Sequence, residues 1–171
     1  MQIGAYHAPA TIADAARLLA ELPDAVPLAG GMTLLPVIRQ RLAAPDAVID
    51  LGRIADLDTI RIEDGCVQEG TRQPNRLIIG AGTTHAAVAD SHLVATVLPA
   101  LARLAGDIGD PAVRARGTIG GSLANNDPAA DYPAAALALD ARIVTDRRVI
   151  AATGFFRGFF QTALMPGEII T

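Results

Sequence analysis

The sequence has 171 residues, a formal net charge of −4 at pH 7, a single cysteine and no tryptophan. A chain of this length can bury a substantial core as one domain, and its acidic balance argues against nucleic acid as the main partner. Cys66 alone excludes an internal disulfide and a cysteine cluster for zinc or iron–sulfur ligation. The N-terminus has no signal-peptide pattern and no apolar run reaches membrane-spanning length, which predicts a cytoplasmic protein without a membrane span.

The first fifty residues alternate between strand and helix patterns. Apolar residues within 15–22 recur at i, i+3, i+4 and i+7, and predict a helix that begins at Thr11 or Asp14. The other elements expected here are a strand at 25–29, a helix at 34–42 and a strand at 47–51. Short connections between strand, helix and strand favour parallel pairing. Residues 1–52 are therefore predicted to form a small α/β lobe.

The pattern of predicted elements changes after Asp58, where several short strands are followed by helices. Asp64-Gly65 predicts a hairpin turn between the first two strands, and residues 70–75 predict an exposed loop before the third. Thr83 or Thr84 can cap a helix that follows. The remaining elements expected are strands at 59–62, 66–68, 76–80, 141–145, 148–152 and 168–171, and helices at 98–105 and 155–161. Residues 53–171 are predicted to form an α+β lobe with a mostly antiparallel sheet.

Two glycine pairs stand out as candidate binding loops. Thr118-Ile119-Gly120-Gly121-Ser122 follows the Asp110-Pro111 break, and Ala29-Gly30-Gly31-Met32-Thr33 follows the strand at 25–29. Glycine tolerates positive φ and leaves no Cβ in the way of a ligand, and amides near such a turn can converge on an anion. Neither loop fits the Rossmann or the P-loop motif. One Gly-Gly pair is equally compatible with a tight turn, whereas two separated pairs suit a diphosphate held from both sides.

Few other residues indicate chemistry. Asp127 can cap a helix that starts at Pro128, and Asp131 can cap one that starts at Tyr132. The three histidines, His7, His85 and His92, are scattered and are interpreted as surface or turn residues. No metal-ligand, nucleophile or carboxylate-pair spacing is present, so we predict no catalytic and no metal-binding residue.

All four phenylalanines lie within residues 155–160. At helical spacing Phe155 and Phe159 share one face, and Phe156 and Phe160 share another. The pattern predicts a packed core helix, or alternatively a helix with one face against a subunit or a further domain.

Three segments together resemble a known family: AGGMTLLP, TIGGSLANNDPAADYPA and FFQTALMPGEIIT. They resemble the FAD-binding (medium) subunit of molybdenum hydroxylases, the group that includes the carbon monoxide dehydrogenase medium subunit and the FAD domain of xanthine dehydrogenase. The resemblance runs from Tyr6 to Thr171. It implies a two-lobed, PCMH-type α+β fold with FAD between the lobes. It also leads us to expect that the family's C-terminal domain is absent.

The resemblance also implies which residues bind FAD. Asn125 matches a position near the second glycine loop, and Asp131 matches an aspartate near the adenosine half of FAD. The other implied cofactor-binding residues are Leu28, Ala29, Gly30, Gly31, Met32, Thr33, Thr118, Ile119, Gly120, Gly121, Ser122, Ile169 and Ile170. Met32 departs from the family pattern, in which a polar residue is frequent at this position.

The function implied is that of the flavoprotein component of a molybdopterin-dependent oxidoreductase. By resemblance, molybdopterin lies in a large partner subunit and [2Fe–2S] clusters lie in a small one, and FAD passes electrons to NAD⁺, quinone or another acceptor. Two alternatives remain open: a stand-alone FAD-dependent dehydrogenase, and a flavin-free assembly module.

Overall fold

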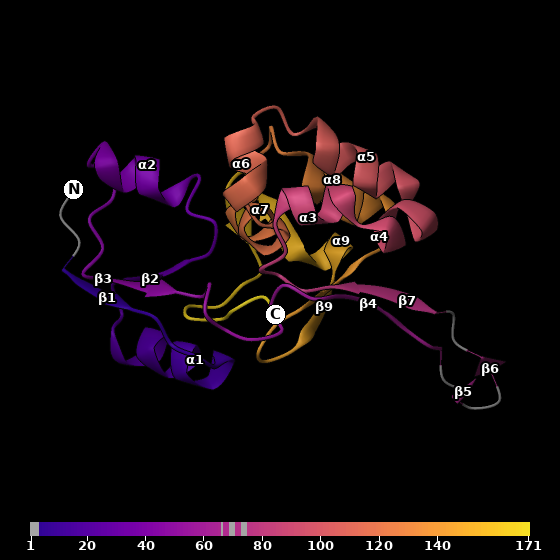
Figure 1. Ribbon diagram of the computed structural model, residues 1–171. Helices are drawn as coiled ribbons and strands as arrows, with labels where there is room; N and C mark the ends of the chain where they lie inside the picture. The colour runs from indigo at the N-terminus through magenta and orange to yellow at the C-terminus, as the bar shows by residue number, and fades with distance from the viewer. Residues whose placement is uncertain (1–3, 66, 69–70, 73–74) are drawn as a thin grey trace.

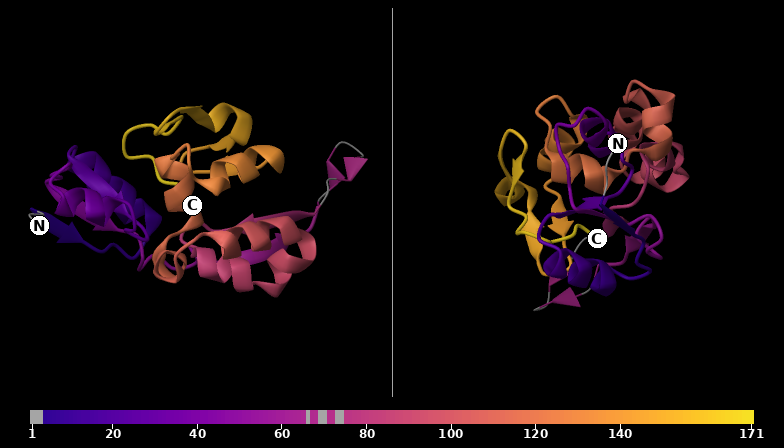
Figure 2. Two further views of the ribbon diagram at one scale, coloured as in Figure 1. Left: turned by 90° about the horizontal axis from the view of Figure 1, so that it is seen from above. Right: turned by 90° about the vertical axis from the view of Figure 1, so that its left-hand side faces the viewer.

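The computed structural model describes residues 4–65, 67–68, 71–72 and 75–171. Two bodies lie side by side in Figure 1, with the first fifty residues forming one of them and a larger helical body forming the other. Figure 2 shows the same separation from above, and it shows that the paired strands β5 (Val67–Gln68) and β6 (Thr71–Arg72) project away from both.

The smaller body is a three-stranded parallel sheet in the order β1-β3-β2. Its central strand begins with three apolar residues, Ala47-Val48-Ile49, and Val48 and Ile49 are fully buried. Two helices cover the opposite faces of the sheet, so β3 needs apolar residues on both sides (Figure 1). The elements are β1 (Ala5–His7), α1 (Ile12–Glu21), β2 (Ala25–Leu28), α2 (Leu34–Arg39) and β3 (Ala47–Asp50). The predicted parallel pairing is confirmed.

The larger body combines helices with antiparallel strand pairs. The helices are α3 (His85–Asp90), α4 (His92–Val97), α5 (Pro99–Asp107), α6 (Pro111–Arg116), α7 (Ile119–Asn125), α8 (Asp131–Ala138) and α9 (Ala152–Phe155). The strands are β4 (Ile60–Glu63), β5 (Val67–Gln68), β6 (Thr71–Arg72), β7 (Arg76–Ile79), β8 (Arg142–Val144), β9 (Val149–Ala151), β10 (Phe156–Gly158) and β11 (Gln161–Thr162). Val88, Tyr132 and Phe155 are among the residues that form its core. The predicted α+β fold class is confirmed; the lobe boundary near residue 52 stays a prediction.

The predicted hairpin at Asp64-Gly65 is wrong. Strand β4 pairs with β7, from Ile60 opposite Ile79 to Glu63 opposite Arg76, and β5 pairs with β6. A four-residue ladder between β4 and β7 forms more backbone hydrogen bonds than one turn with a two-residue strand. Strand β6 also lies within the predicted 70–75 loop, while Cys66, Gly70, Gln73 and Pro74 lie outside the described residues.

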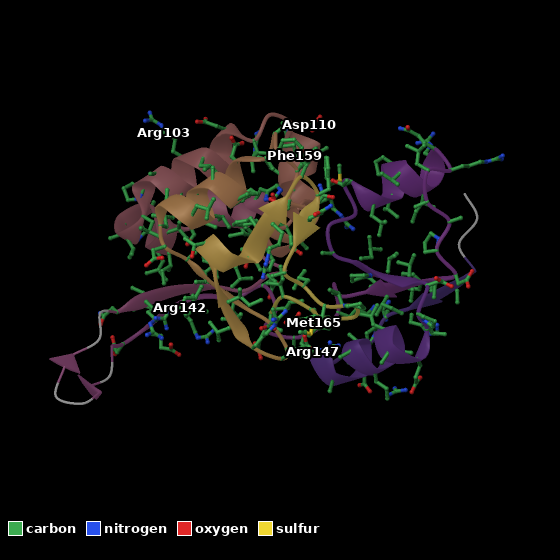
Figure 3. The ribbon with its side chains drawn as sticks, turned by 180° about the vertical axis from the view of Figure 1, so that it is seen from behind. Arg103, Asp110, Arg142, Arg147, Phe159 and Met165 are labelled. Carbon is green, nitrogen blue, oxygen red and sulfur yellow. The ribbon has the colours of Figure 1, made fainter. Side chains whose placement is uncertain are left out.

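The predicted helix at 155–161 is also wrong. Helix α9 ends at Phe155, and β10 and β11 form an antiparallel hairpin. Phe160 has a φ of 56°, which a right-handed helix does not allow. Phe155 is fully buried, whereas Phe159 at the hairpin tip is 78% exposed (Figure 3). The aromatic residues therefore do not share helix faces.

Other boundaries differ from those expected. Asp110-Pro111 begins α6 instead of breaking the chain: Asp110 accepts the amides of Ala112 and Val113, and Pro111 occupies the first turn. Helix α8 begins at Asp131, so Asp127 does not cap it; the Asp127 carboxylate accepts the amide of Ala129 instead. Asp131 is likewise inside the helix and not at its cap. The predicted strand at 168–171 is reduced to one bridge, between Thr145 and Ile170.

Candidate functional site

A cavity of about 820 Å³ lies where the two bodies meet. Pockets of about 300–1,000 Å³ are typical of small-molecule and cofactor sites. Residues of both glycine segments line the cavity, together with the end of β3, the start of α3 and the C-terminal segment. Two stretches that are far apart in the sequence therefore form one concave site.

The structure brings together all the predicted cofactor-binding residues except two. Ile119 lines a neighbouring cavity of about 500 Å³, because the first turn of α7 directs it away from the loop at residues 29–33. Asp131 is exposed at the start of α8 and does not line the larger cavity. The predicted residues that do line it are Leu28, Ala29, Gly30, Gly31, Met32, Thr33, Thr118, Gly120, Gly121, Ser122, Asn125, Ile169 and Ile170.

The first glycine segment, residues 29–33, has the geometry of an anion-binding loop. Gly31 has a φ of +75°, which L-residues with a Cβ rarely adopt. Residues 29–33 connect the end of β2 to the start of α2, and Thr33 precedes α2 without forming a side-chain cap. Among the described residues, no protein hydrogen bond engages the amides of residues 30–33. These amides are therefore available to a ligand.

The second glycine segment differs from the expectation. Gly120 and Gly121 lie in the first turn of α7, with Thr118 as the N-cap, and neither has positive φ. The amides are already bonded: Ile119 donates to Thr83 O, Gly120 donates to Ala81 O, and Gly121 donates to Thr118 Oγ1. The expected convergence of these amides on an anion is therefore wrong. Among the amides of residues 118–122, only that of Thr118 has no bond within the described chain, so this segment contributes mainly space.

The missing Cβ atoms serve different purposes at three of the glycines that line the cavity, Gly30, Gly120 and Gly121. A Cβ on Gly120 would lie 2.5 Å from the Cβ of Ala81, so this glycine allows close packing of α7. A Cβ on Gly30 would lie 2.0 Å from Arg116 O, so this glycine allows the two bodies to touch. A Cβ on Gly121 would meet only Thr118 Oγ1, at 2.9 Å, and Ala29 Cβ, at 3.9 Å. Of these three glycines, only Gly121 leaves the space of its missing Cβ open to the cavity.

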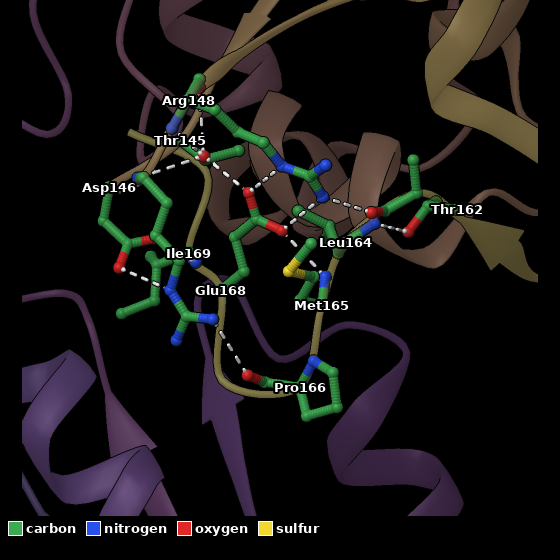
Figure 4. Close-up of polar contacts among 11 residues, drawn as sticks. Thr145, Asp146, Arg148, Thr162, Leu164, Met165, Pro166, Glu168 and Ile169 are labelled. Carbon is green, nitrogen blue, oxygen red and sulfur yellow. Dashed lines mark hydrogen bonds and ion pairs between the residues drawn. The ribbon is translucent and has the colours of Figure 1, made fainter.

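One wall of the cavity is the C-terminal segment, which an ion pair holds in place (Figure 4). Glu168 is buried, and its carboxylate accepts two hydrogen bonds from Arg148, both 2.8 Å long. Thr145 Oγ1 and the amide of Met165 donate to it as well, each at 2.7 Å. The ion pair lowers the pKa of Glu168 to about 2, with further contributions from Met165 and Thr145. These bonds fix Ile169 and Ile170 against the cavity.

Charged side chains of both signs line the rest of the cavity. The cationic side chains are those of Arg53 and Arg116. The acidic side chains, besides that of Glu168, are those of Asp50 and Asp58. Asp50 is engaged within the protein, since it accepts hydrogen bonds from the Tyr6 hydroxyl and from the amide of Gly52. The bond to Asp50 raises the pKa of the Tyr6 phenol. In the described part of the chain, no group of three His, Cys, Asp or Glu side chains could hold a metal ion.

His85 lines the cavity, so its interpretation as a surface or turn residue is wrong. It is only 6% exposed, and its ring lies 5.2 Å from that of Tyr132. Burial lowers the pKa of its imidazole. One feature of the sequence could have indicated this position. His85 begins a helix shortly after β7 and the Gly80-Ala81-Gly82 turn, and loops between strands and helices often carry binding residues.

The residues present fit a dinucleotide with a diphosphate. The cavity joins free loop amides on one side to an unfilled glycine face on the other, and apolar residues of the C-terminal segment border the same space. An elongated ligand with an anionic centre and apolar ends matches this distribution.

The chain belongs to the family described as the FAD binding domain in molybdopterin dehydrogenase, whose model matches residues 1–171. The family resemblance drawn from the sequence is thereby confirmed, as is FAD as the cofactor of the family.

Individual relatives support the same assignment. The chain is 42% identical over 171 residues to the carbon monoxide dehydrogenase medium chain of Afipia carboxidovorans, which covers 97% of this chain and 56% of the relative. It is 41% identical to the nicotine 6-hydroxylase medium subunit of Paenarthrobacter nicotinovorans, over 97% of this chain and 56% of that protein. The carbon monoxide dehydrogenase structure from Hydrogenophaga pseudoflava matches with a TM-score of 0.89 and 40% identity, over 99% of this chain and 57% of the solved one. The chain thus spans a little over half the length of these relatives.

No helix in the described ranges combines the length and the apolar character needed to cross a membrane.

Proposed function

We propose that this chain binds FAD in the cavity between its two bodies and serves as the flavin-carrying part of a molybdopterin-dependent oxidoreductase. The observation that carries the proposal is the meeting of the two glycine segments: Gly30 packs against the backbone of Arg116 and Gly117, which precede Thr118 and the second glycine pair. The diphosphate lies at this junction, with the amides of residues 30–33 as donors and the open side of Gly121 as the space it occupies.

When bound, FAD supplies the redox chemistry, since it accepts electrons and passes them on. This chain's residues bind and orient it. Ile169 and Ile170 border the cavity as apolar contacts, Asn125 contributes an amide near the second segment, and no side chain acts as a general acid or base. Asp131 and Ile119 lie outside the cavity, so the proposed binding set excludes them.

The proposed partners are a large molybdopterin subunit and a small [2Fe–2S] subunit, from which electrons reach FAD, with NAD⁺ or quinone as the final acceptor. The names of relatives support this proposal, since they are medium chains or medium subunits of dehydrogenases and hydroxylases. We place the complex in the cytoplasm.

Calorimetric titration of flavin-free protein tests the proposal. We expect FAD to bind much more tightly than FMN or riboflavin, because only FAD carries a diphosphate that can reach both glycine segments. Equal affinity for FAD and FMN would refute the diphosphate site, and no binding of any flavin would favour an assembly module.

A further inference from the structure

In the larger body, most backbone donors at the junction of the glycine segments are already bonded within the protein; among residues 117–122 of the described chain, only the amide of Thr118 has no such bond. The amides of Ile119, Gly120 and Gly121 are bonded within the protein, to Thr83 O, Ala81 O and Thr118 Oγ1. The amide of Gly117 is also bonded, to Val113 O at 2.6 Å. Apart from the Thr118 amide, a hydrogen bond from this part of the larger body to an anionic group must therefore come from a side chain.

His85 is a side chain of the larger body that lies at this junction and can donate. A Cβ on Gly117 would lie 2.6 Å from His85 Nε2, so this edge of the ring rests directly against Gly117. In turn, the Cα of Gly117 lies 2.8 Å from where a Cβ of Gly30 would be. Gly117 therefore lies between the His85 ring and Gly30, and all three residues line the cavity.

The environment of the ring decides which nitrogen carries the proton. Nδ1 is buried and has no hydrogen-bond partner in the described part of the chain. Burial lowers the pKa of the ring, so the imidazole is neutral and has one N–H. A buried N–H without an acceptor costs free energy, and orphaned N–H groups are rarer than orphaned acceptors. The proton therefore belongs on Nε2, at the edge beside Gly117.

We propose that His85 is a further binding residue of this site, and that its Nε2–H donates a hydrogen bond to a diphosphate oxygen of the bound dinucleotide. The inference rests on the proposed FAD site. It adds a side-chain donor of the larger body to the backbone donors of residues 30–33 in the smaller body.

Two amide side chains make a matched test, because the Gln amide nitrogen reaches the position of Nε2 and the shorter Asn amide nitrogen reaches only that of Nδ1. We expect His85→Gln to bind FAD within about threefold of wild type. His85→Asn and His85→Phe should each weaken FAD binding about 10- to 100-fold, the effect of losing one hydrogen bond to a charged group. Riboflavin, which lacks phosphate, should bind all variants as it binds wild type.

Tyr132→Phe is the control. Its hydroxyl is buried and unpartnered beside the His85 ring, but Tyr132 does not line the cavity, so FAD affinity should stay at the wild-type value. Circular dichroism and thermal melting verify the fold of each variant. Should a His85 variant not fold, ¹⁵N spectra of the histidine rings in wild type provide the second measurement: an Nε2-protonated His85 whose Nε2 signal moves when FAD binds, but not when riboflavin binds, is expected.

Unchanged FAD affinity in His85→Asn and His85→Phe would overturn the inference, and so would an equal loss of FAD and riboflavin. A proton on Nδ1 in the spectra would overturn it as well. Failure of wild type to bind FAD at all is a different result, since it would refute the proposed function itself.

Discussion

At the scale of single residues, Gly120 and Gly121 are neighbours with opposite requirements. We expect Gly121→Ala to keep the fold and to weaken FAD binding at least about tenfold, because its Cβ enters the space assigned to the diphosphate. Its effect on stability should be small, since replacing glycine inside a helix stabilises by about 0.5–1 kcal/mol and crowding of the Thr118 cap offsets this gain. Calorimetry and thermal melting measure the two effects separately.

Gly120→Ala is the matched comparison. Its Cβ would lie 2.7 Å from Ala81 O and 2.5 Å from Ala81 Cβ, so α7 must shift and the free energy of unfolding should fall by about 1–3 kcal/mol. If Gly121→Ala bound FAD like wild type, the glycine pair would be needed for packing alone.

Gly30 does not behave like Gly121, although the sequence suggested equivalent roles. Its Cβ would overlap Arg116 O, at 2.0 Å, so Gly30→Val should separate the two bodies as well as block the site. We expect a lower melting temperature together with loss of FAD binding. A Gly30→Val protein that melts like wild type would show that the contact between the bodies is dispensable.

At the scale of elements, Asn126 holds the β10–β11 hairpin against α7. Its amide nitrogen donates to Gly158 O at 2.7 Å and to Gln161 O at 2.8 Å, and its own carbonyl accepts the amide of Phe160. It also has a φ of 45°, which asparagine tolerates better than alanine. Asn126→Ala should therefore lower the free energy of unfolding by about 2–4 kcal/mol.

Hydrogen exchange locates that effect. Amides of the hairpin should exchange faster in Asn126→Ala, while amides of the β1–β3–β2 sheet should be unchanged at conditions of equal global stability. Uniformly faster exchange in both bodies would contradict a local role for Asn126.

The C-terminal segment should make stability depend on acid pH through Glu168. The pKa of this carboxylate is lowered to about 2 in the folded state, from 4.5 when unperturbed. A lowered folded pKa stabilises the protein above pH 4.5, and the contribution is lost as pH falls from 4.5 to 2. Glu168→Gln should thus unfold more easily than wild type at pH 7, by about 1–3 kcal/mol, and the difference should vanish near pH 2.

Chemical denaturation across this pH range measures the difference. Glu21→Gln is the control, because Glu21 pairs with Arg17 on the exposed face of α1 and should change stability by less than about 0.5 kcal/mol. A Glu168→Gln curve parallel to wild type down to pH 2 would exclude the ion pair as the source of the dependence.

The sequence predicted helices and strands correctly where a regular spacing of apolar residues continues over several turns or where the connections are short. Helix α1 and the parallel strands β2 and β3 follow from apolar spacing and short connections. The 155–161 segment was mispredicted because its conformation depends on Asn126, more than thirty residues away, which bonds the hairpin carbonyls. Likewise, the β4–β7 pairing depends on a ladder that outcompetes a favourable Asp64-Gly65 turn.

The glycine pairs and the family motifs were sufficient to predict which segments form the candidate site. The role of each glycine was not predictable, because it depends on the distant backbone that a Cβ would meet, Arg116 O for Gly30 and Ala81 O for Gly120. His85 was missed for the same reason: only the packing of Tyr132 and Gly117 around it makes an isolated histidine a buried cavity residue.

At the scale of the whole molecule, the flavin is expected to have no route to substrate within this chain. The sequence has one cysteine, and the described residues contain no metal-binding group. Dithionite should therefore reduce bound FAD, whereas purines, aldehydes or carbon monoxide should not change its visible absorbance in the absence of partner subunits. Substrate-dependent bleaching by the purified, metal-free protein would support a stand-alone dehydrogenase instead.

The contact between Gly30 and Arg116 also bears on how fast the protein folds and how long it lasts. The two residues are more than eighty positions apart, so a large loop must close before they meet. We expect the nucleotide site to be among the last parts to assemble, so that FAD binds molecules that have completed folding. A ligand of this kind depletes the open states that proteases cleave. In a cell, the lifetime of this protein would follow the supply of its flavin.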